Sequence, residues 1–279
     1  MIFESDEIIA LSAGAANCLD GTWPDRVCRQ PTRAELHVYR APMPISATAR
    51  GRALVYAGGG YLQLVHDKEG VEIARWLNSQ GIDAYVLLHR LPGQRNGQGN
   101  DPSSAWPFDI ALQDGLRALD HLATLPPLPL LHVGLSSGGH LAGVMSCQHH
   151  AVQGCGVLIA YAPVNANHRD YKAPVGKPDF PPPEKQAFYN AWPIGLAAEP
   201  QGLPTMPIFL AYALHDAIVP IEHALNFIRS ARDAGLQLDA HIFNDAPHGF
   251  ALRELGGSQQ AWPTLALDWI ARRLATANP

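Results

Sequence analysis

The sequence predicts an α/β protein in which a mostly parallel central sheet is flanked by helices on both faces. Short apolar runs such as ALVYA, YVLLH, LLHVG and GVLIAYA alternate with stretches of helical periodicity through most of the chain. These runs are continuously apolar, which is typical of strands buried on both faces of a parallel sheet. The 279 residues, 47% hydrophobic and 16% charged, are expected to form one domain over residues 1–279.

The predicted elements follow one another in a regular order. Residues 34–39 alternate apolar and polar, which predicts a half-buried strand near the sheet edge. The strand RALVYA leads into three glycines, a helix is expected over 67–80, and the strand AYVLLH follows. Asp109 stands where it would cap the next helix, which the prolines at 126–129 end. The remaining elements are a strand over 130–134, a helix over 140–148, strands over 156–162 and 207–213, a helix over 221–235, a strand over 239–243 and a helix over 262–275.

One region, at about 163–206, interrupts this alternation. It is rich in proline and contains aromatic residues that include Phe180 and Trp192. A long stretch without clear periodicity is either functional or disordered, and its aromatic content argues against disorder. We therefore interpret it as a cap-like insertion over a binding site.

Charge and hydropathy exclude several classes of partner. The net charge is −5, which gives no attraction to nucleic acid or to anionic lipid. No apolar run approaches the roughly 18 residues of a membrane-spanning helix, and the acidic N-terminal stretch is unlike a secretory signal. We expect a cytoplasmic protein with a small-molecule substrate and no nucleic-acid or membrane partner. A homodimer is one possible assembly.

The string GLSSG, at the predicted junction of a strand and a helix, matches the pattern G-x-S-x-G. The match is to Gly134, Ser136 and Gly138, because Leu135 stands where Ser137 would need a glycine. In this motif a strained turn projects the serine hydroxyl beyond the end of the sheet, and the glycines avoid clashes where the chain passes close to itself. Ser136 is the predicted nucleophile.

A serine hydroxyl needs a base to take its proton and an acid to orient that base. Asp216 follows the strand PIFLAYA and His248 follows the strand DAHIF, so the order along the chain is Ser136, Asp216, His248. Asp245 and Glu222 are rival acids, but the loop after the preceding strand is where the acid of such a triad sits. We therefore predict Asp216 as the acid and His248 as the base.

An ester reaction also needs donors for the developing oxyanion. Three glycines follow the strand ALVYA, where bare backbone N–H groups could face a reacting carbonyl. We assign the oxyanion hole to Gly59, Gly60 and the amide of Ser137. The glycines could instead form a plain turn or a phosphate site, although no lysine follows as in a phosphate-binding P-loop.

Together, AGGGY, LHRLP, WPFDIALQDGLRAL, GLSSGGHLAG, HDAIVP and APHGF resemble the hormone-sensitive-lipase-like esterases of the α/β-hydrolase superfamily, especially their acetyl-xylan-esterase-like branch. The resemblance covers about residues 50–255. It implies the α/β-hydrolase fold and deacylation of small esters, often acetyl groups on sugars, without a metal or organic cofactor. Two departures are Ala57, where many relatives carry histidine or proline, and His89, where tyrosine is common. We expect the substrate pocket to be lined by Tyr61, His89, Phe180 and Trp192.

The leading hypothesis is a serine carboxylesterase for short acyl esters, with acetylated carbohydrate fragments as candidate substrates. The same residues could serve an aryl formamidase of the N-formylkynurenine type. A catalytically silent ligand-binding protein is the alternative from another class, disfavoured by a complete triad. Cys147, His149 and His150 fit no zinc signature, so no metal site is predicted.

Overall fold

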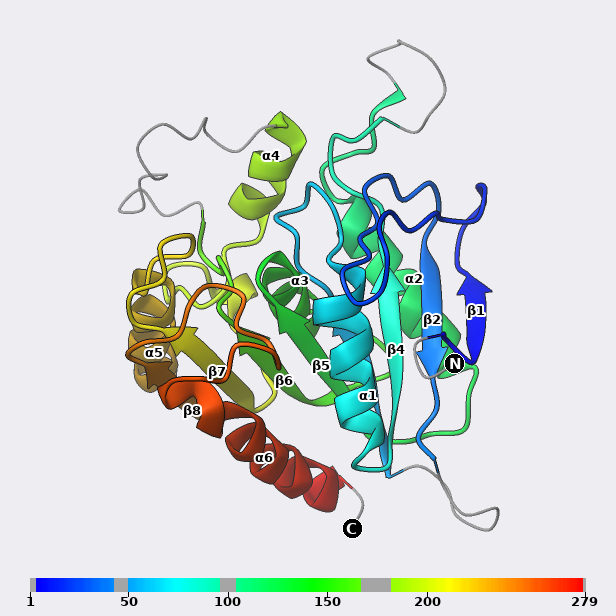
Figure 1. Cartoon of the computed structure of the whole chain (residues 1–279). Helices are drawn as coiled ribbons and strands as arrows, with labels where there is room; N and C mark the ends of the chain where they lie inside the picture. Colours follow the sequence, from blue (N-terminus) through cyan, green and yellow to red (C-terminus); the bar gives the residue numbers. More distant parts are fainter. Residues whose placement is uncertain (1–3, 43–49, 96–103, 167–181, 278–279) are drawn as a thin grey trace.

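A computed structural model describes residues 4–42, 50–95, 104–166 and 182–277, and its central feature is an eight-stranded sheet (Figure 1). The strand order is β1-β2-β4-β3-β5-β6-β7-β8. β2 pairs antiparallel with both neighbours, and the other pairs are parallel. The strands are β1 (Glu7–Ala10), β2 (Glu35–Tyr39), β3 (Gly51–Tyr56), β4 (Ile82–Leu88), β5 (Leu130–Leu135), β6 (Gly154–Ala160), β7 (Ile208–Ala213) and β8 (Leu238–Phe243).

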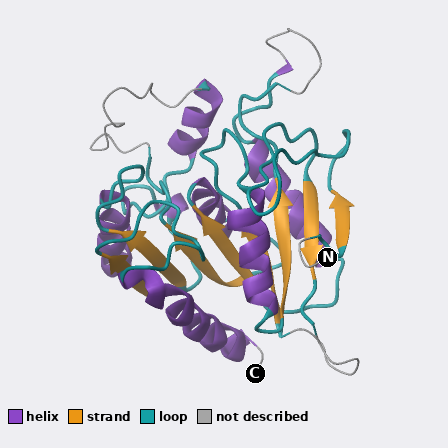
Figure 2. Ribbon diagram, viewed as in Figure 1, coloured by secondary structure: helices purple, strands orange, loops and turns teal. Residues whose placement is uncertain are grey.

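Helices cover both faces of this sheet (Figure 2), as the sequence predicted. Successive residues of a strand point to opposite faces: Ala53 and Val55 of β3 pack with α1 and α6, whereas Leu54 and Tyr56 pack with α2, α3 and α5. The predicted fold class is therefore confirmed. The helices are η1 (Asp67–Val71), α1 (Glu72–Asn78), α2 (Ile110–Ala123), α3 (Ser137–Ser146), α4 (Pro183–Ala191), η3 (Pro200–Gly202), α5 (Glu222–Ala234), η4 (Ser258–Ala261) and α6 (Trp262–Ala277).

The antiparallel side of the sheet differs from the sequence prediction. The strand expected at 34–39 is fully buried as β2, rather than half-buried. Its side chains are covered on both faces, since Leu36 and Val38 lie in the core cluster that includes α2 and His37 contacts His66. A short strand that was not predicted, β1, pairs along the outer side of β2. The predicted helix at 67–80 is also divided, because it starts as the π-helix η1 and continues as α1.

Two helix starts also depart from expectation. Asp109 occupies the N-cap position of α2 but makes no side-chain cap bond, and its Oδ1 accepts a hydrogen bond from Gln113 Nε2 at 3.0 Å instead. The region at about 163–206 contains α4, which begins at a proline and was not predicted. The part of that region from 167 to 181 lies outside the described residues.

The parallel strands place the predicted site residues together, beyond the carboxyl ends of the strands. The carboxyl ends of β3, β5 and β7 lead directly into the three-glycine loop, the turn at Ser136 and the loop of Asp216. Ligands of open α/β sheets bind beyond these strand ends. No helix in the described part of the chain combines the length and the apolar composition needed to cross a bilayer.

Candidate active site

Ser136 lies in the turn between β5 and α3 with a strained backbone, φ 51° and ψ −128°. The chain can pass through this turn only because glycines flank it. A Cβ on Gly134 would meet the Gly138 carbonyl, and one on Gly138 would meet the carbonyl oxygens of Tyr56 and Ala57. The Ser136 amide donates to Ala160 O at 2.9 Å, which ties the turn to the end of β6. Positive φ at a non-glycine residue is held only where surrounding contacts enforce it.

The three residues expected to form a triad lie in one hydrogen-bonded series. Ser136 Oγ lies 3.2 Å from His248 Nε2, and His248 Nδ1 lies 2.7 Å from Asp216 Oδ2. Asp216 Oδ1 accepts the amides of Ile218 and Val219 at 2.8 and 2.9 Å, so the carboxylate is fixed from its own loop. Because an ionised carboxylate only accepts, the Nδ1 proton of His248 points to Asp216, and Nε2 is left to accept the Ser136 proton.

The rival acid that is nearest to His248 in the sequence is engaged elsewhere. Asp245 accepts hydrogen bonds from the Ser258 amide at 3.1 Å and from the Ser258 hydroxyl at 2.6 Å. These bonds lower the pKa of Asp245 and hold the loop before η4. The structure therefore places Asp216, and not Asp245, against the His248 imidazole.

The loop that carries His248 is anchored in the core on its far side. Phe250 is fully buried, and the Trp262 indole donates to the Ala251 carbonyl at 2.7 Å. Tyr161, at the end of β6, packs its ring edge-on against the imidazole, with ring centroids 5.3 Å apart. These contacts fix the orientation of the ring without occupying its Nε2.

The oxyanion loop after β3 is held in a way that the sequence did not reveal. The Gly60 amide donates to Ser137 Oγ at 2.8 Å, so it is already occupied, contrary to its expected role as a free donor. Within the described part of the chain, the amides of Gly59 and Ser137 have no hydrogen-bond partner. Gly59 adopts φ 128°, and a Cβ there would collide with the Gln63 carbonyl. Two of the three expected donors are thus available.

A buried carboxyl group, Glu69, lies beneath this loop. Its Oε2 accepts the Gly58 amide at 2.8 Å, and its Oε1 accepts the Tyr161 hydroxyl at 3.2 Å. Burial raises the pKa of Glu69, opposed by the Gly58 hydrogen bond, the charge of His248, the Tyr161 hydroxyl and the charge of Lys68. No sequence pattern singles out Glu69 or Tyr161, because a glutamate at the start of a helix and a tyrosine after a strand carry no motif.

The residues expected to line the substrate pocket are distributed differently. Tyr61 and His89 are each 1% exposed, so the structure places them inside an aromatic cluster and not at an open surface. The Tyr61 hydroxyl pairs with His140 Nδ1 at 2.9 Å, and His140 Nε2 donates to the Trp192 carbonyl at 2.8 Å. Burial lowers the pKa of His140 to about 4, so this ring is neutral at pH 7. Trp192 is partly exposed, and Phe180 lies outside the described residues.

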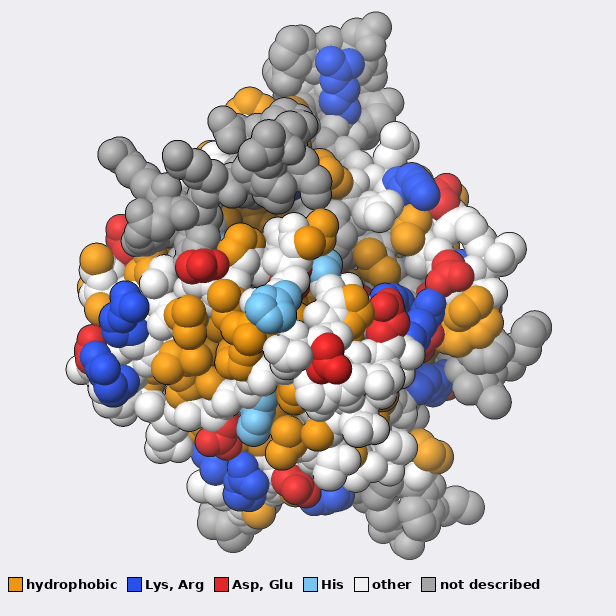
Figure 3. All heavy atoms as spheres, turned by 60° about the vertical axis from the view of Figure 1, so that its left-hand side comes forward, with side chains coloured by type: hydrophobic (Ala, Val, Ile, Leu, Met, Phe, Trp, Pro, Cys, Tyr) orange, Lys and Arg blue, Asp and Glu red, His pale blue; other side chains and the backbone are white. Residues whose placement is uncertain are grey.

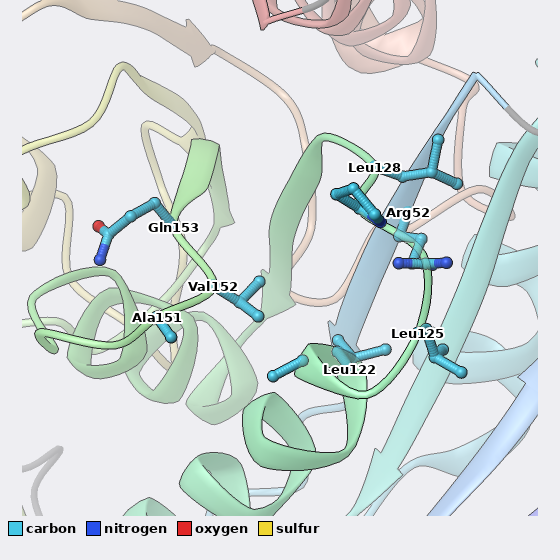
Figure 4. Close-up of a pocket in the computed structure, with 9 residues that line it drawn as sticks. Arg52, Leu122, Leu125, Leu128, Ala151, Val152 and Gln153 are labelled. Carbon is cyan, nitrogen blue, oxygen red and sulfur yellow. The ribbon is translucent and has the colours of Figure 1, made fainter.

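The triad and one described pocket lie at opposite ends of the sheet. The pocket has a volume of about 320 Å³ and lies at the amino ends of β3, β5 and β6 (Figure 4). The Arg52 side chain in its wall donates to the Pro126 carbonyl at 2.7 Å and so holds the loop before β5. Across the described ranges, no three His, Cys, Asp or Glu side chains are grouped as a metal site.

Comparisons with solved structures give the same fold. An acetyl ester-xyloside bifunctional hydrolase from Caldicellulosiruptor lactoaceticus matches with a TM-score of 0.66 at 21% identity, over 96% of this chain and 97% of that one. A carboxylesterase from Lactobacillus plantarum matches with a TM-score of 0.67 at 17% identity, over 92% of this chain and 97% of that one. The predicted α/β-hydrolase fold is confirmed by these neighbours.

Sequence comparison also finds a similarity to an esterase. An acetylxylan esterase of Xylanibacter ruminicola is 27% identical over 212 residues, which are 72% of this chain. The match covers 41% of the length of that relative. Residues 113–276, more than half of the chain and the part that carries Ser136, Asp216 and His248, match the prolyl oligopeptidase family. The chain therefore belongs to the prolyl oligopeptidase family, within the α/β-hydrolase fold.

Proposed function

We propose that this protein is a serine carboxylesterase that hydrolyses short-chain acyl esters. One observation carries the proposal: Ser136, His248 and Asp216 form a continuous hydrogen-bonded series that starts at a strained strand-to-helix turn. A hydroxyl held in this way can be deprotonated at the moment of attack, because the imidazole is oriented and its positive form is stabilised.

The reaction would proceed in two halves. Ser136 Oγ attacks the ester carbonyl while its proton passes to His248 Nε2, and Asp216 stabilises the imidazolium from the other side of the ring. The free amides of Gly59 and Ser137 bind the oxyanion of the tetrahedral intermediate. The proton then passes to the leaving alcohol, and water repeats the cycle on the acyl-enzyme.

The surroundings of the triad favour an uncharged substrate. Leu214 and Ile218, in the loop of Asp216, are 39% and 49% exposed. Figure 3 shows hydrophobic side chains beside histidines in the middle of one face, with most lysines and arginines towards its rim. The relatives that act on acetyl esters or acetylated xylan by name support acetylated carbohydrate fragments as substrates. Trp192, partly exposed at the end of α4, is our candidate for the pocket wall.

The test is hydrolysis of p-nitrophenyl esters from acetate to octanoate by the wild type and by Ser136→Ala. We expect the highest kcat/KM at acetate and a fall of about a million-fold in kcat in the variant, since the other triad members cannot act without the nucleophile. Ser146→Ala is the control, because its hydroxyl lies at the far end of α3, the helix that follows Ser136, and donates to Gly143 O.

Two further substrates separate the alternatives. Turnover of a formanilide far above that of acetate esters would favour a formamidase, and turnover of a prolyl p-nitroanilide would favour peptide hydrolysis. Equal activity of the wild type and Ser136→Ala toward every substrate would overturn the proposal. A fluorophosphonate that failed to label Ser136 in the folded protein would then point to a ligand-binding protein.

A further inference from the structure

The second carboxylate near the reaction centre, Glu69, belongs to neither the triad nor the oxyanion donors. It lies on η1 and is only 4% exposed. Both of its oxygens accept hydrogen bonds, one from the Gly58 amide and one from the Tyr161 hydroxyl. Buried carboxylates are retained only where such partners compensate for lost hydration. The positions of Gly58 and Tyr161 indicate what the Glu69 carboxylate does.

The first partner, Gly58, links Glu69 to the nucleophile and to the oxyanion loop. A Cβ on Gly58 would collide with Glu69 Oε2 and would lie 2.7 Å from both Leu135 O and Ser136 Cβ. The carboxylate therefore fills the gap between the end of β3 and the turn at Ser136. By holding the Gly58 amide, it fixes the backbone immediately before Gly59, whose own amide is free to bind an oxyanion.

The second partner, Tyr161, links Glu69 to the general base. Its hydroxyl donates to Glu69 while its ring packs against the imidazole of His248. Glu69 Oε1 also lies 3.9 Å from the position of a Cβ on Gly249, the residue after His248. Glu69 is thus close enough to interact with the charge of the imidazole, from a different direction than Asp216.

Burial outweighs the groups around Glu69, so the pKa of this carboxyl is raised above its usual value. Burial raises the pKa of Glu69, whereas the Gly58 hydrogen bond, the charge of His248, the Tyr161 hydroxyl and the charge of Lys68 each act to lower it. Lys68 is itself paired with Glu254 at 2.9 Å, so its charge is shared. The Gly58 amide can only donate, which requires an accepting oxygen at Oε2.

We propose that Glu69 is a positioning residue of the esterase reaction, whose carboxylate holds the oxyanion loop through Gly58 and favours the positive charge that His248 gains when Ser136 attacks. Glu69 takes up no proton, because the Ser136 proton passes to His248 Nε2 and then to the leaving group. This inference rests on the proposed function, but its electrostatic part can be tested without turnover.

The charge state is tested first in the wild type. The ¹³C chemical shift of the Glu69 side-chain carboxyl is followed by NMR as the pH is changed. Its signal is assigned from its loss in Glu69→Gln, or by backbone assignment if that variant does not fold. We expect the shift of a carboxylate at pH 7. A protonated carboxyl at pH 7 would overturn the proposal, whatever the behaviour of any variant.

The effect on the base is tested by following the His248 imidazole by NMR, with its signal assigned from His248→Gln. In Glu69→Gln the midpoint of the imidazole titration should move down by about one pH unit, since a nearby opposite charge is lost. Glu254→Gln removes a more exposed carboxyl that pairs with Lys68, the neighbour of Glu69 in the sequence; it is the matched control and should move the midpoint by less than about 0.3 unit. Equal midpoints in the wild type and Glu69→Gln would contradict the proposal even if the protein hydrolysed no ester.

The effect on catalysis is read from kcat and KM separately. Glu69→Gln should lower kcat on p-nitrophenyl acetate about ten-fold with little change in KM, because the loss is in transition-state stabilisation. The acid limb of the pH dependence of kcat/KM should move to lower pH together with the imidazole midpoint. In Glu69→Asp the charge is kept but its reach is shortened, so kcat should fall while the acid limb stays in place. If the acid limb of kcat/KM lay at the same pH in Glu69→Gln and in the wild type, Glu69 would have only a packing role and the electrostatic proposal would be wrong.

Discussion

Two chains of carboxylate and imidazole groups occur in this molecule, and they differ in what lies at their ends. In the first, the triad, Asp216 holds His248 and His248 holds Ser136. The second, which we name the buried imidazole chain, joins four side chains through contacts of 3.2 Å each: Glu35 to His37, His37 to His66, and His66 to Asp67. The residue types are nearly the same, yet only the first chain ends at a candidate nucleophile.

The ends of the two chains decide this difference. Arg33 and Arg26 bind the two carboxylates of the buried imidazole chain, and all of its ring nitrogens are engaged. The triad instead ends at a strained serine, with the His248 side chain 21% exposed. The buried imidazole chain, with an arginine bound at each end, connects β2 to η1 and stabilises the fold. The triad ends at an accessible hydroxyl, from which a proton can be taken and to which it can be returned. We therefore expect substitutions in the two chains to affect different measurements.

The largest expected effect is on catalysis in the triad. Asp216→Asn keeps the size of the side chain and an oxygen for the Ile218 and Val219 amides, but its amide nitrogen can donate to His248 Nδ1 and so favour the wrong tautomer. We expect kcat on p-nitrophenyl acetate to fall about 10,000-fold, with a melting temperature close to that of the wild type. Steady-state kinetics and circular dichroism measure the two quantities.

Asp245→Asn is the matched control for this substitution, because Asp245 is the nearer aspartate in the sequence but pairs with Ser258. Its kcat should stay within about two-fold of the wild type, as is usual for a surface position away from the reacting atoms. A loss in Asp245→Asn as large as that in Asp216→Asn would mean that the structure assigns the wrong acid, and the contrast with the buried chain would disappear.

The next effect is on stability in the buried imidazole chain. Burial alone would raise the pKa of Glu35, but hydrogen bonds from His37, Arg33 and the Asn17 amide outweigh it and lower this pKa to about 2. A carboxyl whose pKa is lower in the folded than in the unfolded state stabilises the fold above its unfolded pKa. This stabilisation is lost as the pH falls from about 4.5 to about 2.

Glu35→Gln removes the charge and keeps the shape, so it should lower the free energy of unfolding by about 3 kcal/mol at pH 7. The difference from the wild type should shrink towards pH 2, where the wild-type carboxyl is also protonated. Urea denaturation at several pH values measures it. Glu7→Gln is the control on the exposed Glu7–Arg40 pair, expected to cost less than about 1 kcal/mol. A difference that stays constant down to pH 2 would show that the charge of Glu35 is not what stabilises the chain.

The sequence predicted the grouping of Ser136, His248 and Asp216 better than that of the buried imidazole chain, for a physical reason. Ser136, Asp216 and His248 each follow a predicted strand, and the parallel sheet brings the strand ends together without any knowledge of side-chain contacts. The pairing of His37 with His66 depends on where η1 lies against β2, which no periodicity specifies. Glu69 escaped notice for the same reason, since its burial depends on the gap beside Gly58.

The elements that were missed are those whose stability comes from their neighbours. β1 has four residues, too few for a clear alternation, and is held by pairing along β2. α4 begins at a proline in a proline-rich region, and it is held by Phe188 and Tyr189, which pack against Tyr61 and His140. Local propensity was therefore a poor guide to both, although it located the helices of the main alternation.

The smallest expected effect is that of a substitution at Ser137, whose amide is free and whose hydroxyl takes part in a structural hydrogen bond. The Ser137 amide is our proposed oxyanion donor, while its hydroxyl oxygen accepts a structural hydrogen bond from the Gly60 amide. Ser137→Ala keeps the amide and removes the bond, so the oxyanion loop loses one anchor. We expect kcat to fall about five-fold, equivalent to about 1 kcal/mol, with a small change in melting temperature.

Ser146→Ala controls for the loss of a buried hydroxyl from the same helix, and it should leave kcat per folded molecule unchanged. A rise of kcat in Ser137→Ala would have the opposite meaning. It would show that the Gly60 amide, once released, becomes an additional oxyanion donor, as the sequence first suggested. The bond between Gly60 and Ser137 would then restrain the reaction instead of supporting it. The direction in which kcat changes in Ser137→Ala therefore decides whether the hydrogen bond between the Gly60 amide and Ser137 Oγ supports the reaction or only stabilises the fold.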